Sequence, residues 1–227
     1  IMYQVAPFVY WQVYLFSICF VGSAYGKPTT PNIPKINPNF VVNTVEVDNT
    51  NTTILEQKLV FDIDLRRSMM YGYGTLVKGA MQQIRRCDIH PEGWMISAGG
   101  PDTSDPSTWQ CTNTTINAAG ELPWNCQYST FWSFPDDMKY AGNDVINETP
   151  CDKWVYFNGG DEYALWATQG VDASGQIIDI PVANGKTLSA TGGNSWTIYY
   201  YDFVGGTPAD SEYTAIDGLQ CPESTPP

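Results

Sequence analysis

The sequence predicts a mainly β protein in which a curved, mostly antiparallel sheet is accompanied by one or two short helices. Three observations support this class. Apolar and polar side chains alternate from Phe40 onward, glycine and asparagine turn signals separate the apolar segments, and helical periodicity is sparse. Strands joined by turns of about two to five residues pair antiparallel, because parallel neighbours need a much longer crossover.

The alternation is clearest in QKLVFDIDLRR, residues 57–67. Leu59, Phe61, Ile63 and Leu65 fall on one face of this segment and charged side chains on the other, as in a half-buried strand. Further strands are predicted at residues 41–47, 68–77, 80–87, 93–98, 109–115, 128–134, 153–157, 163–168, 177–182 and 197–203. Turns are predicted at residues 99–101, 158–160, 183–185 and 192–194, and helical turns at residues 207–216 and 135–140.

The composition divides the chain into four parts: an apolar segment at 1–26, a proline-rich linker at 27–39, the β domain at 40–222 and a flexible tail at 223–227. The apolar segment has two interpretations. Small residues at Ala24 and Gly26 fit the cleavage site of a signal peptide. The many aromatics and the lack of a preceding basic residue fit a retained β-strand that completes a neighbour's open sheet.

Charge and cysteine content indicate where the protein acts. With 24 acidic and 11 basic residues the net charge is −13, which argues against nucleic acid and anionic membranes as partners. Six cysteines and three N-x-T sequons, at Asn51, Asn113 and Asn147, predict a secreted, extracellular glycoprotein with disulfide bonds. We predict disulfides between Cys111 and Cys126 and between Cys151 and Cys221, a pairing that the sequence does not fix.

No motif predicts catalysis, a cofactor or a metal. The one histidine, His90, lies three residues from Cys87, a separation that puts the two on opposite faces of a strand, so it fits a turn better than a Cys/His pair. The cysteines lack zinc spacing, and the acids near Asp48 and in residues 134–148 lack the spacing of a calcium loop. No pair of carboxylates stands out as a glycosidase pair, and we predict that the protein is not an enzyme.

Six short motifs carry a resemblance to known proteins: RRSMMYGYG at 66–74, CDKW at 151–154, YALW at 163–166, IPVANG at 180–185, YYYDF at 199–203 and DGLQCP at 217–222. In order and spacing they resemble the non-catalytic N-terminal domain of long-precursor papain-like cysteine proteases and, more distantly, ependymin-related secreted glycoproteins. The resemblance covers roughly residues 41–222. It implies a LolA-like half-barrel whose concave face accepts an apolar ligand. A protease domain is absent from the printed sequence, so no catalytic residue is carried over.

The tryptophans are the candidate binding residues of that concave face, and filling the core is their alternative role. The predicted groove, for an apolar ligand or a donor strand, comprises Trp94, Trp132, Trp154, Trp166 and Trp196. The first functional hypothesis is a self-assembling structural subunit whose apolar N-terminal strand completes a neighbour's open sheet. The alternatives are a soluble carrier of a lipid or other apolar ligand, and a protease-associated regulatory module.

Overall fold

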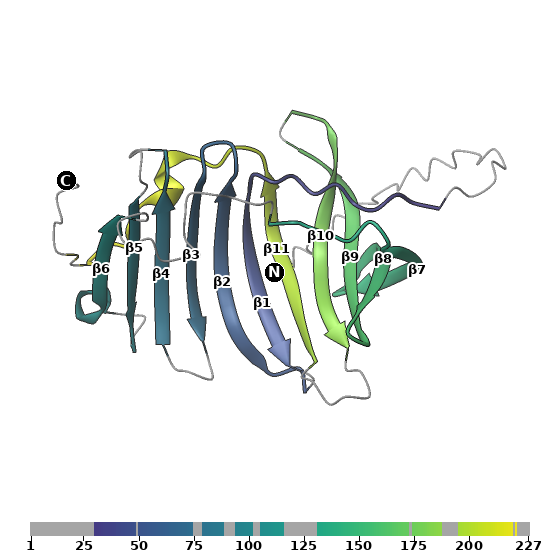
Figure 1. The fold of residues 1–227 in the computed structure, drawn as a ribbon, viewed down its shortest axis with the longest axis horizontal. Helices are drawn as coiled ribbons and strands as arrows, with labels where there is room; N and C mark the ends of the chain where they lie inside the picture. Colours follow the sequence, from purple (N-terminus) through teal and green to yellow (C-terminus); the bar gives the residue numbers. More distant parts are fainter. Residues whose placement is uncertain are drawn as a thin grey trace, which may run out of the picture. The chain divides into compact units, whose positions relative to one another are not determined.

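The computed structural model describes residues 30–48, 50–74, 79–88, 94–101, 105–115, 131–172, 174–187, 195–219 and 221. The chain forms two compact units, Ile1–Pro31 and Asn32–Pro227, and the fold described below is that of the second. Its described part is mainly β: eleven strands form one antiparallel sheet, with two short 3-10 helices and no α-helix (Figure 1). The predicted fold class is thereby confirmed. None of the described helices is long and apolar enough to cross a membrane.

The strands form two antiparallel meanders that meet in the middle of the sheet. The first contains β1 (Phe40–Asp48), β2 (Thr53–Asp62), β3 (Arg67–Gly74), β4 (Gly79–Arg86), β5 (Trp94–Gly100) and β6 (Gln110–Thr115). The second contains β7 (Lys139–Ile146), β8 (Thr149–Asn158), β9 (Asp161–Val171), β10 (Ile177–Thr187) and β11 (Trp196–Gly205). Pairing of β1 with β11 joins them in the order β6-β5-β4-β3-β2-β1-β11-β10-β9-β8-β7.

The two halves of the sheet bury opposite faces. We call the side that carries Phe40 and Val42 the Phe40 face, and the other side the Asn43 face, because successive side chains alternate between them. In the β2–β6 half, the Asn43 face packs against the C-terminal segment, including Tyr213 in the 3-10 helix η2 (Asp210–Tyr213). In the other half, the Phe40 face is covered by residues 131–138, which cross in front of β11, β10 and β9 in Figure 1.

The C-terminal segment is held by a buried ion pair. Arg67 is 2% exposed and Asp62 is fully buried, and Arg67 Nε donates to Asp62 Oδ2 at 2.9 Å. The same guanidinium pairs with Asp210 and donates to the carbonyl of Pro208 at 3.1 Å, while it lies 4.4 Å from the centre of the Tyr213 ring. The ion pair between Asp62 on β2 and Arg67 on β3 thus holds the segment that follows β11 in place, through Asp210 and Pro208.

Residues 32–39 pack on the sheet where β10 and β11 separate. The β10–β11 pairing covers only Ala183–Lys186, and beyond it Ile36 forms a parallel bridge with Asp179 of β10. Asp179 also accepts a hydrogen bond from the Lys35 backbone nitrogen at 2.7 Å, and Ile36 is buried. This part of the predicted linker therefore belongs to the compact unit that contains the sheet.

Several predicted elements differ from the structure. Residues 131–134 are irregular and cover the sheet, residues 183–185 lie inside β10 instead of forming a turn, and residues 135–140 contain a turn followed by strand β7. The predicted strand at 57–67 ends at Asp62, because this carboxylate accepts the Leu65 backbone N–H and closes a tight turn. The C-terminal helical turn exists as η2. The predictions for residues 1–26, 128–130, 192–194 and 223–227 concern residues outside the described part.

Candidate functional site

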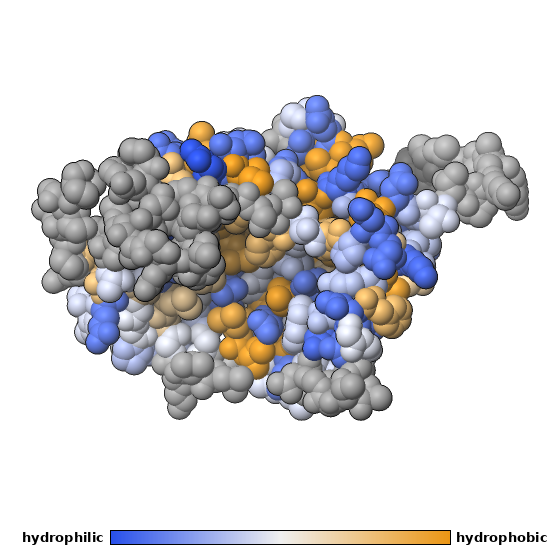
Figure 2. Space-filling model, viewed as in Figure 1, coloured by the Kyte–Doolittle hydropathy of each residue, from blue (hydrophilic) through white to orange (hydrophobic). Residues whose placement is uncertain are grey.

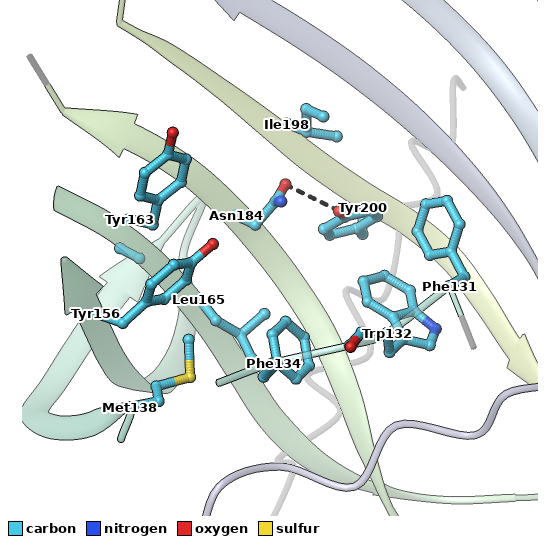
Figure 3. A pocket seen from close by; sticks show the side chains of 13 residues that line it. Phe131, Trp132, Phe134, Met138, Tyr156, Tyr163, Leu165, Asn184, Ile198 and Tyr200 are labelled. Carbon is cyan, nitrogen blue, oxygen red and sulfur yellow. Dashed lines mark hydrogen bonds between the residues drawn. The ribbon is translucent and has the colours of Figure 1, made fainter. Parts of the chain in front are cut away.

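A cavity of about 210 Å³ opens on the Phe40 face between the sheet and residues 131–138. Figure 2 shows this side of the molecule hollowed near its middle, with hydrophobic residues inside and hydrophilic residues toward its borders. The lining residues are drawn in Figure 3: Phe131, Trp132, Ser133, Phe134, Met138, Tyr156, Tyr163, Ala164, Leu165, Asn184, Gly185, Ile198 and Tyr200. Most of them are aromatic or aliphatic, as in sites that bind apolar ligands.

The floor of the cavity follows directly from strand register. Ile198, Asn184 and Leu165 face one another across β11, β10 and β9, so their side chains form one cross-strand row. Tyr163 and Tyr156 form the next row, and their rings stack with centroids 5.0 Å apart. The five residues come from four strands, and only their alternation onto one face brings them together.

The cover of the cavity is a set of aromatic contacts. The centroid of the Trp132 ring lies 5.4 Å from the ring centroid of Phe40, 5.1 Å from that of Tyr200 and 4.9 Å from that of Phe131. Phe131 remains 44% exposed at the mouth. The indole N–H of Trp132 is buried and has no acceptor among the described residues.

Asn184 and Tyr200 form the polar part of the cavity. The Tyr200 hydroxyl donates to Asn184 Oδ1 at 2.9 Å, and burial raises the pKa of Tyr200, with a smaller contribution from the negative charge of Glu46. Tyr200 is therefore a neutral donor at ordinary pH, which fixes the orientation of the amide. The Asn184 amide group then offers its N–H donors to an acceptor in the cavity.

A second cavity, of about 190 Å³, lies beside the first on the same face. It is lined by apolar residues of β1, β2 and β3, and Gln83 and Arg85 supply its polar side. Arg85 Nη2 donates to Gln83 Oε1 at 2.5 Å. Phe131 lines both cavities, so its ring separates two apolar spaces along one side of the sheet.

The structure separates the five tryptophans predicted to line a groove. Of the four whose side chains the structure describes, only Trp132 lines the cavity. Trp154 is buried in the core on the same face, and Trp196 lies at the start of β11 outside the lining set. Trp166 lies on the Asn43 face, where its Nε1 donates to Asp144 at 2.9 Å. Trp94 lies in β5, and its side chain is outside the described part.

Both predicted disulfide pairings are wrong. Cys111 bonds to Cys221, which the C-terminal segment brings to edge strand β6 after it crosses the Asn43 face. Cys151 is a buried free thiol whose Sγ lies 3.6 Å from the carbonyl of Asp144, and burial raises its pKa. Cys87, which the sequence paired with nothing, is also in a disulfide.

The predicted glycosylation sites have different settings. Asn51 and Asn147 are exposed residues with positive φ in the β1–β2 and β7–β8 turns, and Asn113 lies on edge strand β6 with its side chain outside the described part. The Asp48 carboxylate, near Asn51, accepts hydrogen bonds from the backbone of Thr50 and Thr52, which lower its pKa.

His90 and Cys126 lie outside the described residues. Among those described, no group of three or more His, Cys, Asp or Glu could hold a metal ion.

Most of the cavity was missed by sequence reasoning. Asn184 and Gly185 belong to an Ala-Asn-Gly stretch that predicted a turn, and Tyr156, Tyr163 and Tyr200 had no signal beyond strand alternation. That alternation would have placed the three tyrosines on one face if the strand order had been known. The order depends on the pairing of the first and last strands, which is not local information.

Comparison with known proteins gives a distant similarity of fold. No family model matches the chain, and no curated protein matches it. Among solved structures, the crystal structure of a LolA superfamily protein from Nitrosomonas europaea is similar over 81% of this chain and 92% of that one, at 11% sequence identity and a TM-score of 0.21. The likeness concerns the fold alone, a large antiparallel sheet.

Proposed function

We propose that the protein is a non-catalytic, extracellular binding protein that holds an apolar ligand in the cavity on the Phe40 face. The observation that carries the proposal is the cavity of about 210 Å³, lined by aromatic and aliphatic side chains. Such pockets bind mainly by burying apolar surface, while a few polar groups orient the ligand. Here Asn184 is the orienting group, because Tyr200 fixes its amide.

The chemistry of the cavity indicates what the ligand contains. The amide N–H of Asn184 is a donor in the cavity lining, so the bound molecule carries an acceptor oxygen beside an apolar body. The second cavity beyond Phe131 provides space for a longer apolar body. A lipid or a similar molecule with one oxygen-bearing end meets these requirements.

A cavity-filling variant tests the proposal. Ile198→Trp places a large ring on the floor, and Val204→Trp is the control, since Val204 is on the same strand, on the opposite face, and 61% exposed. We expect the unaltered chain and Val204→Trp to bind a fluorescent fatty-acid analogue equally, and Ile198→Trp to lose most of that affinity. Equal binding by all three proteins would reject the cavity as the site.

Self-assembly through an added strand is a second candidate, and one specific contact favours it. The bridge between Ile36 and Asp179 is parallel and lies where β10 and β11 separate, so β10 pairs here with a segment from outside the eleven strands. If the apolar residues 1–26 supply such a strand to a neighbour, sedimentation will show oligomers of the chain and a monomer after removal of those residues. A monomer in both cases would reject this candidate.

A further inference from the structure

The Asn43 face carries a groove that the proposed function does not use. The groove has a volume of about 490 Å³ and lies over β1, β2 and β3. We call it the tyrosine groove and define it by the side chains that point to this face: Asn43, Val45, Glu56, Lys58, Tyr71 and Tyr73.

Register extends the tyrosine groove to β11. One cross-strand row runs Tyr201, Asn43, Lys58 and Tyr71, and the next runs Tyr199, Val45, Glu56 and Tyr73. Each row therefore begins and ends with a tyrosine, with two hydrogen-bonding side chains between them in the first row and one, Glu56, in the second. At about 4.8 Å between strands, each row spans about 14 Å.

The chemistry of these rows suits a saccharide. A tyrosine ring offers an apolar face to the C–H groups of a sugar, and its hydroxyl is both donor and acceptor. Asn43 and Glu56 are exposed. Lys58 Nζ pairs with Glu212 of the C-terminal segment at 2.6 Å. Asn43 Nδ2 donates to Asp202 Oδ2 at 3.0 Å, so the groove offers the Asn43 amide oxygen and the Glu56 carboxylate as acceptors for hydroxyls beside the aromatic rings.

The Asn147 sequon lies at the β11 end of this surface. The β7–β8 turn folds over the Asn43 face, and Asn147 Nδ2 donates to the Tyr201 hydroxyl at 3.2 Å. Nδ2 is the atom that carries an N-linked glycan. The first sugar on this nitrogen is therefore adjacent to the Tyr201 ring, which is 41% exposed.

We propose that the protein's own N-linked glycan at Asn147 lies across Tyr201 and along the tyrosine groove. Attachment forms a bond from the sugar's anomeric carbon to Nδ2 and breaks that carbon's bond to the pyrophosphate of a lipid-linked donor. The pyrophosphate leaves with the electron pair, and the amide gives up one proton. The amide proton that remains is still available to Tyr201. The glycan then covers the exposed Tyr201 ring and continues toward Tyr71, which is partly buried and stacks on Trp109.

Hydroxyl-radical footprinting of the full chain from a eukaryotic secretory host tests the proposal, after glycopeptide mass spectrometry of Asn147. Thr149→Ala removes the sequon and leaves the asparagine in its turn, whereas Thr149→Ser keeps the sequon. We expect Tyr201 and Tyr71 to be oxidised several-fold faster in Thr149→Ala than in the unaltered chain or Thr149→Ser. Thr53→Ala, which removes the Asn51 sequon in the same way, should leave both rates unchanged.

Three outcomes would overturn the proposal: an unoccupied Asn147, equal oxidation in Thr149→Ala and Thr149→Ser, or protection that depends on protein concentration. The last would assign the groove to a glycan of a second copy. Endoglycosidase trimming of the folded, unaltered chain repeats the comparison without a substitution, and loss of protection at Tyr71 is then expected.

Discussion

The two halves of the sheet bury opposite faces and are closed in different ways. The β2–β6 half packs aliphatic residues of the Asn43 face under the C-terminal segment, which a disulfide and the Arg67 ion pair hold in place. The β8–β11 half packs aromatic residues of the Phe40 face under residues 131–138, and no disulfide or ion pair among the described residues ties this cover down. The first half is a fixed core, and we interpret the second as the half that accommodates a ligand.

The largest expected effect is on the fixed half. Arg67→Ala leaves the Asp62 carboxylate buried without its partner, and breaking a buried pair in this way costs about 3–5 kcal/mol. Urea unfolding measures the loss. Lys58→Ala removes the more exposed pair with Glu212 and should cost under about 1 kcal/mol. A similar cost for both variants would contradict the view that the buried pair anchors this half.

Removing the disulfide should have the next largest effect. Cys111 and Cys221 are 110 residues apart, so the bond restricts the unfolded chain strongly, and Cys221→Ser should cost about 3 kcal/mol. The matched control is Cys151→Ser, which removes a buried thiol in the other half and leaves the disulfides in place. We expect dithiothreitol to lower the melting temperature of Cys151→Ser as much as that of the unaltered chain.

Substitution of Trp132, in the segment 131–138 that covers the cavity, should affect ligand binding more than stability. Trp132→Ala removes contacts with Phe40 and Tyr200, and since Trp132 is only half-buried the cost should be about 2 kcal/mol. The stronger effect is on binding: affinity for the fatty-acid analogue should fall, because the variant lacks one wall of the cavity. Unchanged affinity would show that residues 131–138 cover the core without forming a site.

Strand alternation predicted much of the sheet, and what it missed has physical reasons. Strand β7 was missed because KYAGNDVI contains glycine, asparagine and aspartate. As an edge strand it tolerates them, and Gly142, with φ of +112°, occupies a bulge. The disulfides were mispaired because the C-terminal segment crosses the β2–β6 half of the Asn43 face before it reaches β6. The strand order is also needed to place Asn184 in the cavity and to see that the two halves of the sheet bury opposite faces.

The smallest expected effect is a pH dependence in the β8–β11 half. Glu46 adjoins Ile198 at the end of the cavity floor, and burial raises the pKa of its carboxyl above the ordinary value of 4.5. The folded state thus favours the neutral acid. Its contribution to stability is present below that ordinary value and is lost as the pH rises through the folded pKa. Glu46→Gln, which mimics the neutral acid, should raise the melting temperature slightly at pH 7 and leave it unchanged at pH 3.

A control separates this effect from the protein's overall charge. With a net charge of −13, removing any carboxylate reduces repulsion in the folded state. Glu56→Gln removes the same charge from an exposed position on the Asn43 face, so it reports that general effect alone. If Glu46→Gln raises the melting temperature at pH 7 by more than Glu56→Gln does, the excess is due to burial beside the cavity. If the two shifts are equal, the cavity floor contributes nothing to the pH dependence, and the contrast between the halves rests on packing alone.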